Sequence, residues 1–333
     1  MKILHGYRSA GKHLKDPVVA IGVFDGVHLG HRKVVQKMIS SRSGDDKVVL
    51  TFDPHPQAVL NPRKGPPRIM SLSHRLRLFQ IMGVDAAVVV KFSRYLADMG
   101  PGDFVDRVLV KALNARKIFV GENFNFGRGG SEGTTGLKKL AAEHGVDVEI
   151  VGPVRRSGRV VSSTWVRELI SRGELEKARK LLSRPVSVLG TVVEGDSIGR
   201  EIGVPTANID PHHEVIPPVG VYAVAVDVGG EIFPGVLNIG YKPTFYGRDR
   251  RREEPVIEAH IIGFKGDIYG MDLEVFFIKR LRGEMKFSSR DELRDKIKGD
   301  IKASLRICPS FLKSSMGRRM GTCQNTVYKR LFI

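Results

Sequence analysis

Residues 18–31, VVAIGVFDGVHLGH, decide how the first half of this 333-residue chain folds. Residues 18–24 form an unbroken run of small, β-branched and aromatic side chains, which is typical of a strand covered on both faces. Asp25 and Gly26 predict a turn. Apolar side chains recur at helical spacing after His31 and predict an amphipathic helix. The stretch therefore indicates a buried parallel strand, a turn and a helix.

Two histidines stand on either side of Gly30 at the start of this expected helix. The free backbone N–H groups and the dipole of a helix favour an anion at its N-terminus. Gly30 allows such an anion to come close to the main chain. His28, Gly30 and His31 therefore suit the binding of phosphates, although a turn with two exposed histidines explains the same residues.

Strands and helices alternate through the rest of the first half, which predicts a doubly wound parallel sheet. The expected strands are residues 47–52, 86–92, 117–120 and 146–151, and the expected helices are residues 73–82 and 101–114. Asp53, Pro54, His55 and Pro56 follow the second strand, where two prolines predict a loop without helix. Ligands bind at the carboxyl ends of such strands, so we expect either a ligand loop or only a rigid turn here.

Two more stretches of the first half carry candidate ligand groups. Residues 121–136, GENFNFGRGGSEGTTG, are rich in glycine and predict a loop that allows close approach of a ligand. Ser162, Ser163 and Thr164 open the last helix of this half, where hydroxyls alone could serve to cap the helix. Arg167 lies one turn further on, and capping does not explain it.

The second half has a different texture. A helix over residues 174–182 ends at Arg184-Pro185, and short β-rich runs separated by glycine and proline follow, which predicts an antiparallel barrel. The expected strands are residues 186–193, 220–228, 232–239, 256–262 and 273–278. Within residues 195–208, GDSIGREIGVPTAN, glycines could wrap a phosphate, and Thr206 and Asn208 could offer oxygens to Mg²⁺. An ordinary turn explains the same letters.

Composition narrows the class of protein. A hydrophobic fraction of 41% with 27% charged residues is ordinary for a globular protein. We find no apolar run long enough for a membrane span and no apolar leader, and both cysteines lie near the C-terminus, so we expect a cytoplasmic protein without a disulfide framework. The net charge of +18 suits nucleic acid or polyphosphate ligands. Because the basic residues are spread along the chain, nucleic-acid binding is disfavoured as the main function.

The string HLGH resembles the HxGH motif of the nucleotidylyltransferase superfamily, and GVFDGVHLGH resembles the N-terminal module of the prokaryotic bifunctional riboflavin kinase/FMN adenylyltransferases, the FAD synthetases. TFDPHP, ENFNFG and VSSTWVR resemble further motifs of that module. The resemblance implies catalytic roles for His28, His31 and Arg167, and flavin binding by Asp53, His55, Pro56 and Asn123. It implies ATP binding by Gly22, Phe24, Gly26, His28, Gly30, His31, Asn123, Ser162, Ser163, Thr164 and Arg167. Asn123 stands where many members have Asp, and Trp165 where a basic residue is expected.

The second half resembles the riboflavin kinases in PTAN, NIGYKPTF, EAH and LRGEMKF. This resemblance implies that Thr206 and Asn208 hold Mg²⁺ and, with Gly199 and Gly203, bind ATP. It implies that Arg282 and Glu284 bind the flavin and that Glu258 is the general base of the kinase. Strand alternation alone makes Glu258 only an outward-facing residue.

Together the resemblances and the change of texture predict an FMN adenylyltransferase domain (1–172), a linker helix (173–185) and a riboflavin kinase domain (186–303). Residues 304–333 have no clear counterpart in the resemblance, and their polar, basic composition predicts a loosely held tail of unknown role. We expect an α/β Rossmann-like sheet followed by an all-β barrel. ATP would phosphorylate riboflavin to FMN, and a second ATP would adenylylate FMN to FAD. Two alternatives stay open: a kinase whose adenylyltransferase is weakened by Asn123 and Trp165, and a basic nucleic-acid-binding protein on a nucleotide-binding fold. The expected partners are small-molecule substrates, with no membrane; the sequence does not predict the oligomeric state.

Overall fold

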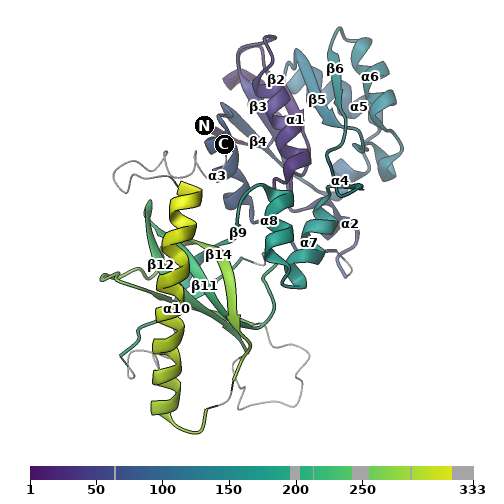
Figure 1. The fold of residues 1–333 in the computed structure, drawn as a ribbon. Coiled ribbons are helices and arrows are strands. Elements are labelled where there is room, and N and C mark those ends of the chain that lie inside the picture. The colour runs from purple at the N-terminus through teal and green to yellow at the C-terminus, as the bar shows by residue number, and fades with distance from the viewer. Residues whose placement is uncertain (64, 196–202, 213, 242–254, 286, 317–333) are drawn as a thin grey trace. The chain divides into compact units, whose positions relative to one another are not determined.

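The computed structural model of the protein describes residues 1–63, 65–195, 203–212, 214–241, 255–285 and 287–316. Gly199, one of the expected ATP-binding residues, lies outside these described residues. The chain divides into two compact units, Met1–Trp165 and Val166–Ile333. In Figure 1 the first unit is coloured from purple to teal and the second from teal to yellow. Each unit is built around its own sheet.

The first unit is organised by a six-stranded parallel sheet in the order β1-β4-β3-β2-β5-β6. Its strands are β1 (Lys2–His5), β2 (Val18–Ile21), β3 (Lys47–Asp53), β4 (Ala86–Lys91), β5 (Lys117–Gly121) and β6 (Asp147–Val151). The order changes direction between β2 and β5, so the carboxyl ends of these two strands form a topological switch point, where open α/β sheets bind ligands. The predicted parallel architecture is confirmed.

Short helices connect these strands, and α1 packs against β2, β3 and β5. The helices are η1 (Ala10–His13), α1 (Leu29–Ile39), α2 (Pro56–Leu60), α3 (Leu72–Met82), α4 (Arg94–Ala97), α5 (Pro101–Asp103), the π-helix η2 (Phe104–Ala112), η3 (Arg128–Gly130) and α6 (Thr134–Ala142). A two-stranded antiparallel ribbon, β7 (Arg155–Arg156) and β8 (Arg159–Val160), precedes the last helix that begins in this unit.

Three expectations for this unit need correction. β2 ends at Ile21 rather than at residue 24, because the chain leaves the sheet at Gly22 and takes left-handed backbone angles at Phe24. The edge strand β1 was not predicted from the sequence. The prolines after β3 do not exclude a helix, because Pro56 occupies the first position of α2, where a missing N–H costs nothing.

The second unit is organised by a closed antiparallel barrel in the order β10-β13-β12-β11-β14-β9, which confirms the predicted barrel. Helices α7 (Ser163–Ser171), which begins just before the division, and α8 (Leu175–Leu182) precede it in the sequence. The strands are β9 (Val186–Val193), β10 (Ala207–Asp210), β11 (Gly220–Val228), β12 (Glu231–Gly240), β13 (Val256–Ile261) and β14 (Asp272–Arg282). The letters PTAN, which an ordinary turn could also explain, overlap β10, because Ala207 and Asn208 are the first two residues of this strand.

The long helix α10 (Arg290–Met316) packs along β11, β12 and β14 (Figure 1). It corrects the expected boundary after Ala303, because the helix continues through this position without a break. Ser304 and Cys308 are fully buried. The Ser304 hydroxyl donates to the carbonyl oxygen of Gly235 at 2.7 Å, and the Cys308 thiol donates to that of Val224 at 3.3 Å. These residues belong to the barrel unit rather than to a loosely held tail.

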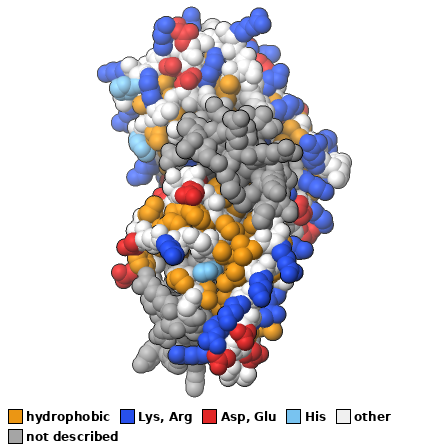
Figure 2. Space-filling view, turned by 60° about the vertical axis from the view of Figure 1, so that its left-hand side comes forward, with side chains coloured by type: hydrophobic (Ala, Val, Ile, Leu, Met, Phe, Trp, Pro, Cys, Tyr) orange, Lys and Arg blue, Asp and Glu red, His pale blue; other side chains and the backbone are white. Residues whose placement is uncertain are grey.

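On the face drawn in Figure 2, the positive charge is spread out rather than gathered in one patch. In Figure 2, Lys and Arg side chains are scattered at several places over the visible face, among acidic and apolar groups. Within the part of the chain that the structure describes, no helix is long and apolar enough to span a membrane.

Candidate active sites

The loop after β2 is held by His28, which caps helix α1. Its Nδ1 atom accepts the backbone N–H groups of Gly30 at 3.2 Å and His31 at 3.4 Å. An imidazole nitrogen that accepts carries no proton, so the hydrogen-bond network assigns the ring proton of neutral His28 to Nε2. The rings of His28 and His31 stack with their centroids 3.7 Å apart. The two predicted histidines are therefore brought together at one helix N-terminus.

Glycine is favoured at three positions of this closely packed loop. A Cβ atom at Gly30 would lie 3.1 Å from the His28 ring, and one at Gly22 would lie 3.0 Å from the Phe24 ring. Gly26 has φ of +83°, and a Cβ there would lie 2.9 Å from the Ile69 side chain. The three glycines predicted to bind ATP thus allow the loop to fold tightly beneath the two imidazoles.

The same loop contains backbone strain that the sequence did not reveal. Phe24 and Val27 have φ of +55° and +39°, in the left-handed region that non-glycine residues avoid. The buried carboxylate of Asp25, which lies between them, holds the loop by accepting the backbone N–H groups of Ile69 at 3.0 Å and Met70 at 3.1 Å. Such strain costs on the order of 1–3 kcal/mol per residue and is concentrated at functional sites.

The hydroxyl residues at the start of α7 have separate tasks. Ser163 donates to the backbone carbonyl oxygen of Asp25 at 2.8 Å, which joins this segment to the loop after β2. Ser162 accepts the N–H of Trp165 at 3.3 Å and acts as a helix cap, while Thr164 is exposed. Arg167 follows one turn further along α7. The guanidinium of Arg159 lies 4.8 Å from the centre of the Trp165 ring, in a cation–π contact.

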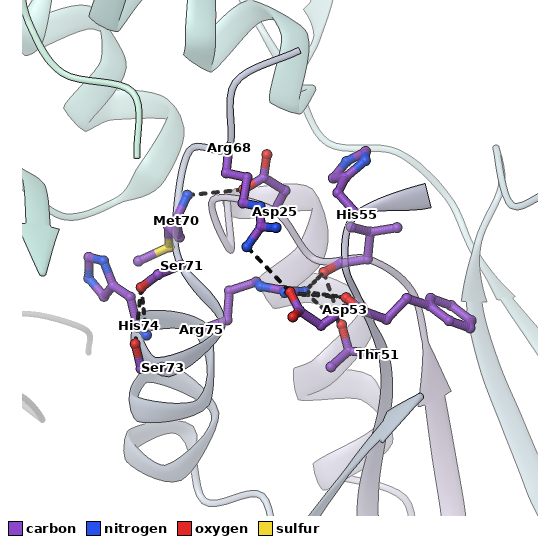
Figure 3. A network of polar contacts seen from close by, with 12 residues as sticks. Asp25, Thr51, Asp53, His55, Arg68, Met70, Ser71, Ser73, His74 and Arg75 are labelled. Carbon is purple, nitrogen blue, oxygen red and sulfur yellow. Dashed lines mark hydrogen bonds and ion pairs between the residues drawn. The ribbon is translucent and has the colours of Figure 1, made fainter. Parts of the chain in front are cut away.

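The residues expected near the flavin lie on two other loops of this sheet edge. Asp53 ends β3 and forms ion pairs with Arg68 at 3.5 Å and Arg75 at 3.4 Å (Figure 3). His55 caps α2 by accepting the N–H of Gln57 at 3.1 Å, which places Pro56 in the first turn. After β5, Asn123 is exposed beside Phe124, whose ring stacks on Phe126 with centroids 5.8 Å apart; this side of the loop offers an amide and an aromatic face.

In the barrel, the strand register aligns three polar side chains. Asn208 on β10 pairs directly with Glu258 on β13, and Glu258 pairs directly with Asn238 on β12. Directly paired residues point to the same face of a sheet. Ile257 and Ala259 are buried, so Glu258 lies on the opposite, outer face, as alternation predicts. Asn238 opens the resembling stretch NIGYKPTF but was not among the expected site residues, and the register shows its place beside Glu258.

Asn208 provides a test of the expected Mg²⁺ site. The residue is only 8% exposed, and its Oδ1 atom has no hydrogen-bond partner among the described residues. Buried polar oxygens are rarely left without a partner unless a water, ion or ligand satisfies them. The described residues contain no cluster of three or more His, Cys, Asp or Glu suited to a metal. The oxygens of Asn208 and half-buried Thr206 fit a hard cation that also binds phosphate oxygens.

The remaining barrel residues lie around this row. His260 lies two positions from Glu258 and bonds through Nδ1 to the carbonyl oxygen of Pro205 at 2.8 Å, which ties β13 to the segment before Thr206. A Cβ at Gly195 would overlap the side-chain amide of Asn208. Gly203 has φ of +77° with open space around it.

The two residues expected to bind flavin in the barrel have different surroundings. Arg282 forms a bidentate ion pair with Asp300 of α10, through Nε at 3.0 Å and Nη2 at 2.8 Å. Glu284 is exposed, and a Cβ at Gly240 would lie 2.8 Å from its carboxylate oxygen. The structure therefore binds Arg282 to the last helix and leaves Glu284 close to β12.

The first unit has two stacked imidazoles at a helix N-terminus beside the switch point of a parallel sheet. The second unit is a closed barrel that carries a carboxylate between two amides. This combination indicates a two-unit class of phosphate-transferring enzyme. Residues 11–165 match the family described as FAD synthetase, and residues 182–308 match the family described as riboflavin kinase. The bifunctional riboflavin kinase/FMN adenylyltransferase of Bacillus subtilis is 35% identical over 315 residues, which cover 93% of this chain and 98% of the relative. That of Escherichia coli K12 is 35% identical over 304 residues, with 90% and 96% covered.

A solved structure named as a macrolide-efflux protein from Streptococcus pneumoniae has a TM-score of 0.76 and 30% identity, over 92% of this chain and 99% of that one. Relatives this similar over nearly their whole length show the family. The chain belongs to the bifunctional riboflavin kinase/FMN adenylyltransferases. It phosphorylates riboflavin to FMN and adenylylates FMN to FAD, with ATP as co-substrate in both reactions.

Proposed function

We propose that the two reactions are divided between the two sheets, with adenylyl transfer in residues 1–172 and riboflavin phosphorylation in residues 186–303. The separate family matches over residues 11–165 and 182–308 support this division. The α10 contacts of Ser304 and Cys308 extend the proposed kinase domain to at least residue 308. Helices α7 and α8 join the two parts of the sequence.

The kinase proposal rests on the row of Asn208, Glu258 and Asn238. A riboflavin hydroxyl is neutral and must lose its proton as its oxygen bonds to the γ-phosphorus of ATP. Glu258 takes that proton, the bond from the γ-phosphorus to the bridging oxygen breaks, and ADP leaves. The two flanking amides orient the carboxylate and the reacting groups. Arg282 and Glu284 are proposed to contact the flavin, while Gly199 and Gly203 border the ATP phosphates.

Thr206 and Asn208 would hold Mg²⁺ beside those phosphates, because their oxygens suit a hard cation. When bound, Mg²⁺ supplies positive charge that offsets the negative charge of the transferring phosphoryl group. Asn208 and Thr206 then contribute by keeping their oxygens fixed at the end of the barrel strand, so little reorganisation is needed during the reaction.

In adenylyl transfer, an FMN phosphate oxygen attacks the α-phosphorus of ATP, and pyrophosphate leaves. The attacking oxygen is already an anion, so no strong base is required. His28 donates its Nε2–H to the phosphates. The developing charge is stabilised by His31, Arg167, the hydroxyls of residues 162–164 and the backbone N–H groups at the start of α1. The residues on the flavin side are Asp53, His55, Pro56 and Asn123.

The same proposal places the protein in the cytoplasm, where riboflavin and ATP are available, and gives it small-molecule substrates rather than a membrane or nucleic acid as its main partners. The scattered basic side chains in Figure 2 are in keeping with binding of several polyphosphate ligands.

The deciding test is the Glu258→Gln variant, which keeps the side-chain size and removes the proton acceptor. We expect the rate of FMN formation from riboflavin, ATP and Mg²⁺ to fall roughly 10²–10⁴-fold, the usual contribution of a positioned acid–base group. Supplied FMN should still become FAD at the wild-type rate. An undiminished kinase rate would make Glu258 a plain strand residue, whereas loss of both activities would contradict the division between the two sheets.

A further inference from the structure

A buried cation, Arg75, contacts two segments of the first unit, the phosphate loop (residues 22–31) and the segment that ends β3 and begins the flavin loop (residues 53–56). Arg75 projects from helix α3, and its side chain is only 3% exposed. Burial lowers the pKa of its guanidinium, while Asp25 and Asp53 oppose that effect. Removing an arginine from water is costly unless its donors are satisfied, so its contacts indicate what it is there to hold.

Those contacts join the ends of two strands. One guanidinium nitrogen, Nη1, donates to the carbonyl oxygen of Val23 at 2.6 Å, just after β2, and to the hydroxyl of Thr51 at 2.9 Å, within β3. The other, Nη2, donates to the carbonyl oxygen of Phe52 at 3.3 Å and to the carboxylate of Asp53 at 3.4 Å, both in β3. Figure 3 shows Arg75 reaching from its helix toward Thr51 and Asp53.

Two further bonds close the arrangement. Thr51 donates its hydroxyl hydrogen to the carbonyl oxygen of Val23 at 3.1 Å, so it links β3 to the phosphate loop directly. The carboxylate of Asp25 accepts the backbone N–H groups of Ile69 and Met70, which lie just before α3. The phosphate loop is therefore fastened to the α3 region twice, once through the Asp25 carboxylate and once through the Arg75 guanidinium.

We propose that Arg75 is a positioning residue for adenylyl transfer, which fixes the spacing between the phosphate loop (residues 22–31) and the flavin loop (residues 53–56). This inference rests on the proposed function, in which these loops hold ATP and FMN. A transfer in which one bound substrate attacks another depends on their separation, and a misplacement of about 1 Å can cost about 10²-fold in rate. A planar guanidinium suits this task because its fork reaches several acceptors in fixed directions.

A purely structural role for Arg75 makes a different prediction. If Arg75 only stabilised the fold, its loss would lower the unfolding temperature and the folded fraction, and the remaining folded molecules would keep the wild-type turnover. If Arg75 positions the loops, each loop still binds its own substrate, but the bound substrates are misaligned. The signature of positioning is therefore a lower kcat with nearly unchanged binding of ATP and FMN.

The test compares three variants of the full chain. We call Arg75 and its acceptors on Val23, Thr51, Phe52 and Asp53 the clamp. Arg75→Lys keeps a positive charge but loses the planar guanidinium. Thr51→Val removes one acceptor of the clamp with almost no change in side-chain shape. Leu109→Ala is the matched control, because Leu109 is fully buried in the core of the same unit without belonging to either loop. For each variant we would measure the unfolding temperature, the KM values for ATP and FMN, the kcat for FAD formation, and FMN formation from riboflavin in the same sample.

We expect Arg75→Lys to lower the kcat for FAD formation about 10²-fold and Thr51→Val to lower it about tenfold, with KM values within a few-fold of wild type and an unchanged kinase rate. Leu109→Ala should lower the unfolding temperature but keep kcat below that temperature. Should Arg75→Lys not fold, Thr51→Val decides alone. Wild-type kcat in a folded Arg75→Lys protein, or in Thr51→Val, overturns the inference.

A companion variant separates this inference from the proposed function. His28→Asn removes the proposed Nε2–H donor without touching the clamp. If His28→Asn forms FAD at least about tenfold more slowly while the clamp variants are fully active, only the positioning role is wrong. If His28→Asn is itself fully active, the proposed site is wrong as well.

Discussion

At the scale of single residues, His28 caps helix α1 with one ring atom, and the proposed function gives another atom of the same ring a part in the reaction. Its Nδ1 accepts two backbone N–H groups at the start of α1, a capping task usually performed by Ser, Thr, Asp or Asn. Because that nitrogen is engaged, the proton of the neutral ring is directed to Nε2, on the other side of the ring. A His residue in this place therefore caps the helix and presents a donor at once.

The two tasks can be separated by His28→Asn and His28→Ala. Asn is a good helix cap, so we expect His28→Asn to unfold at a temperature close to wild type, while His28→Ala loses about 1 kcal/mol of stability. Both variants lack the Nε2–H group and should form FAD at least about tenfold more slowly, with FMN formation unchanged. Thermal unfolding and separate FMN and FAD assays check this. A His28→Asn protein with a wild-type FAD rate would show that the ring serves only as a cap.

At the scale of elements, the sequence predicted those features that local pattern determines. The strands β9 and β11 have the predicted bounds, because both are long, apolar and ended by glycine or polar residues. The edge strand β1 was not predicted, because its four residues show no alternation of apolar and polar side chains. Only one of the four is half-buried, and the other three are exposed. β10 escaped because its polar letters suggest a turn, and only pairing with β9 and β13 makes it a strand.

The candidate sites divide in the same way. Motif resemblance predicted His28, Ser163, Asn208 and Glu258, whose letters are local in the sequence. Asn238 opens the resembling stretch NIGYKPTF, but its place beside Glu258 depends on strand register. Arg75 could not be predicted in this way, because its place depends on contacts across 22 to 52 residues of chain. The left-handed angles of Phe24 and Val27 also leave no mark in the letters, since neither residue type favours them.

Helix α10 gives a prediction at this scale. Truncation after Ala303 removes Ser304 and Cys308, and with them two buried contacts to β12 and β11. A lost buried hydrogen bond and newly exposed apolar surface together cost about 2–4 kcal/mol, which lowers the melting temperature by roughly 5–15 °C. Differential scanning calorimetry and the kinase assay test this. Truncation after Met316 is the control, because it leaves α10 complete.

An unchanged melting temperature after truncation at Ala303 would show that the last turns of α10 add nothing to the barrel. FAD formation from supplied FMN should persist in either truncated protein, because the parallel sheet of residues 1–165 keeps its own core. Its loss would mean that α10 supports both halves of the chain.

At the scale of the whole molecule, the chain contains two units, and the proposed function assigns one of the two reactions to each sheet. The product of one reaction, FMN, is the substrate of the other. FMN can reach the second site either by leaving the protein and binding again or by direct transfer within one molecule. These routes differ in how FAD formation depends on free FMN, so variants impaired in single sites can distinguish them.

The experiment mixes Glu258→Gln, whose kinase should be strongly slowed, with His28→Asn, whose adenylyl transfer should be slowed. Each variant alone should convert riboflavin to FAD more slowly than the wild type. If FMN is released, the mixture should produce FAD after a lag in which free FMN accumulates, and the lag should shorten as the His28→Asn protein, which makes FMN, is increased. The wild-type protein at matched site concentrations should show the same lag. Direct transfer predicts instead that the wild type forms FAD without a lag and without free FMN, and that the mixture forms FAD slowly. Chromatography of FMN and FAD over time distinguishes the two outcomes.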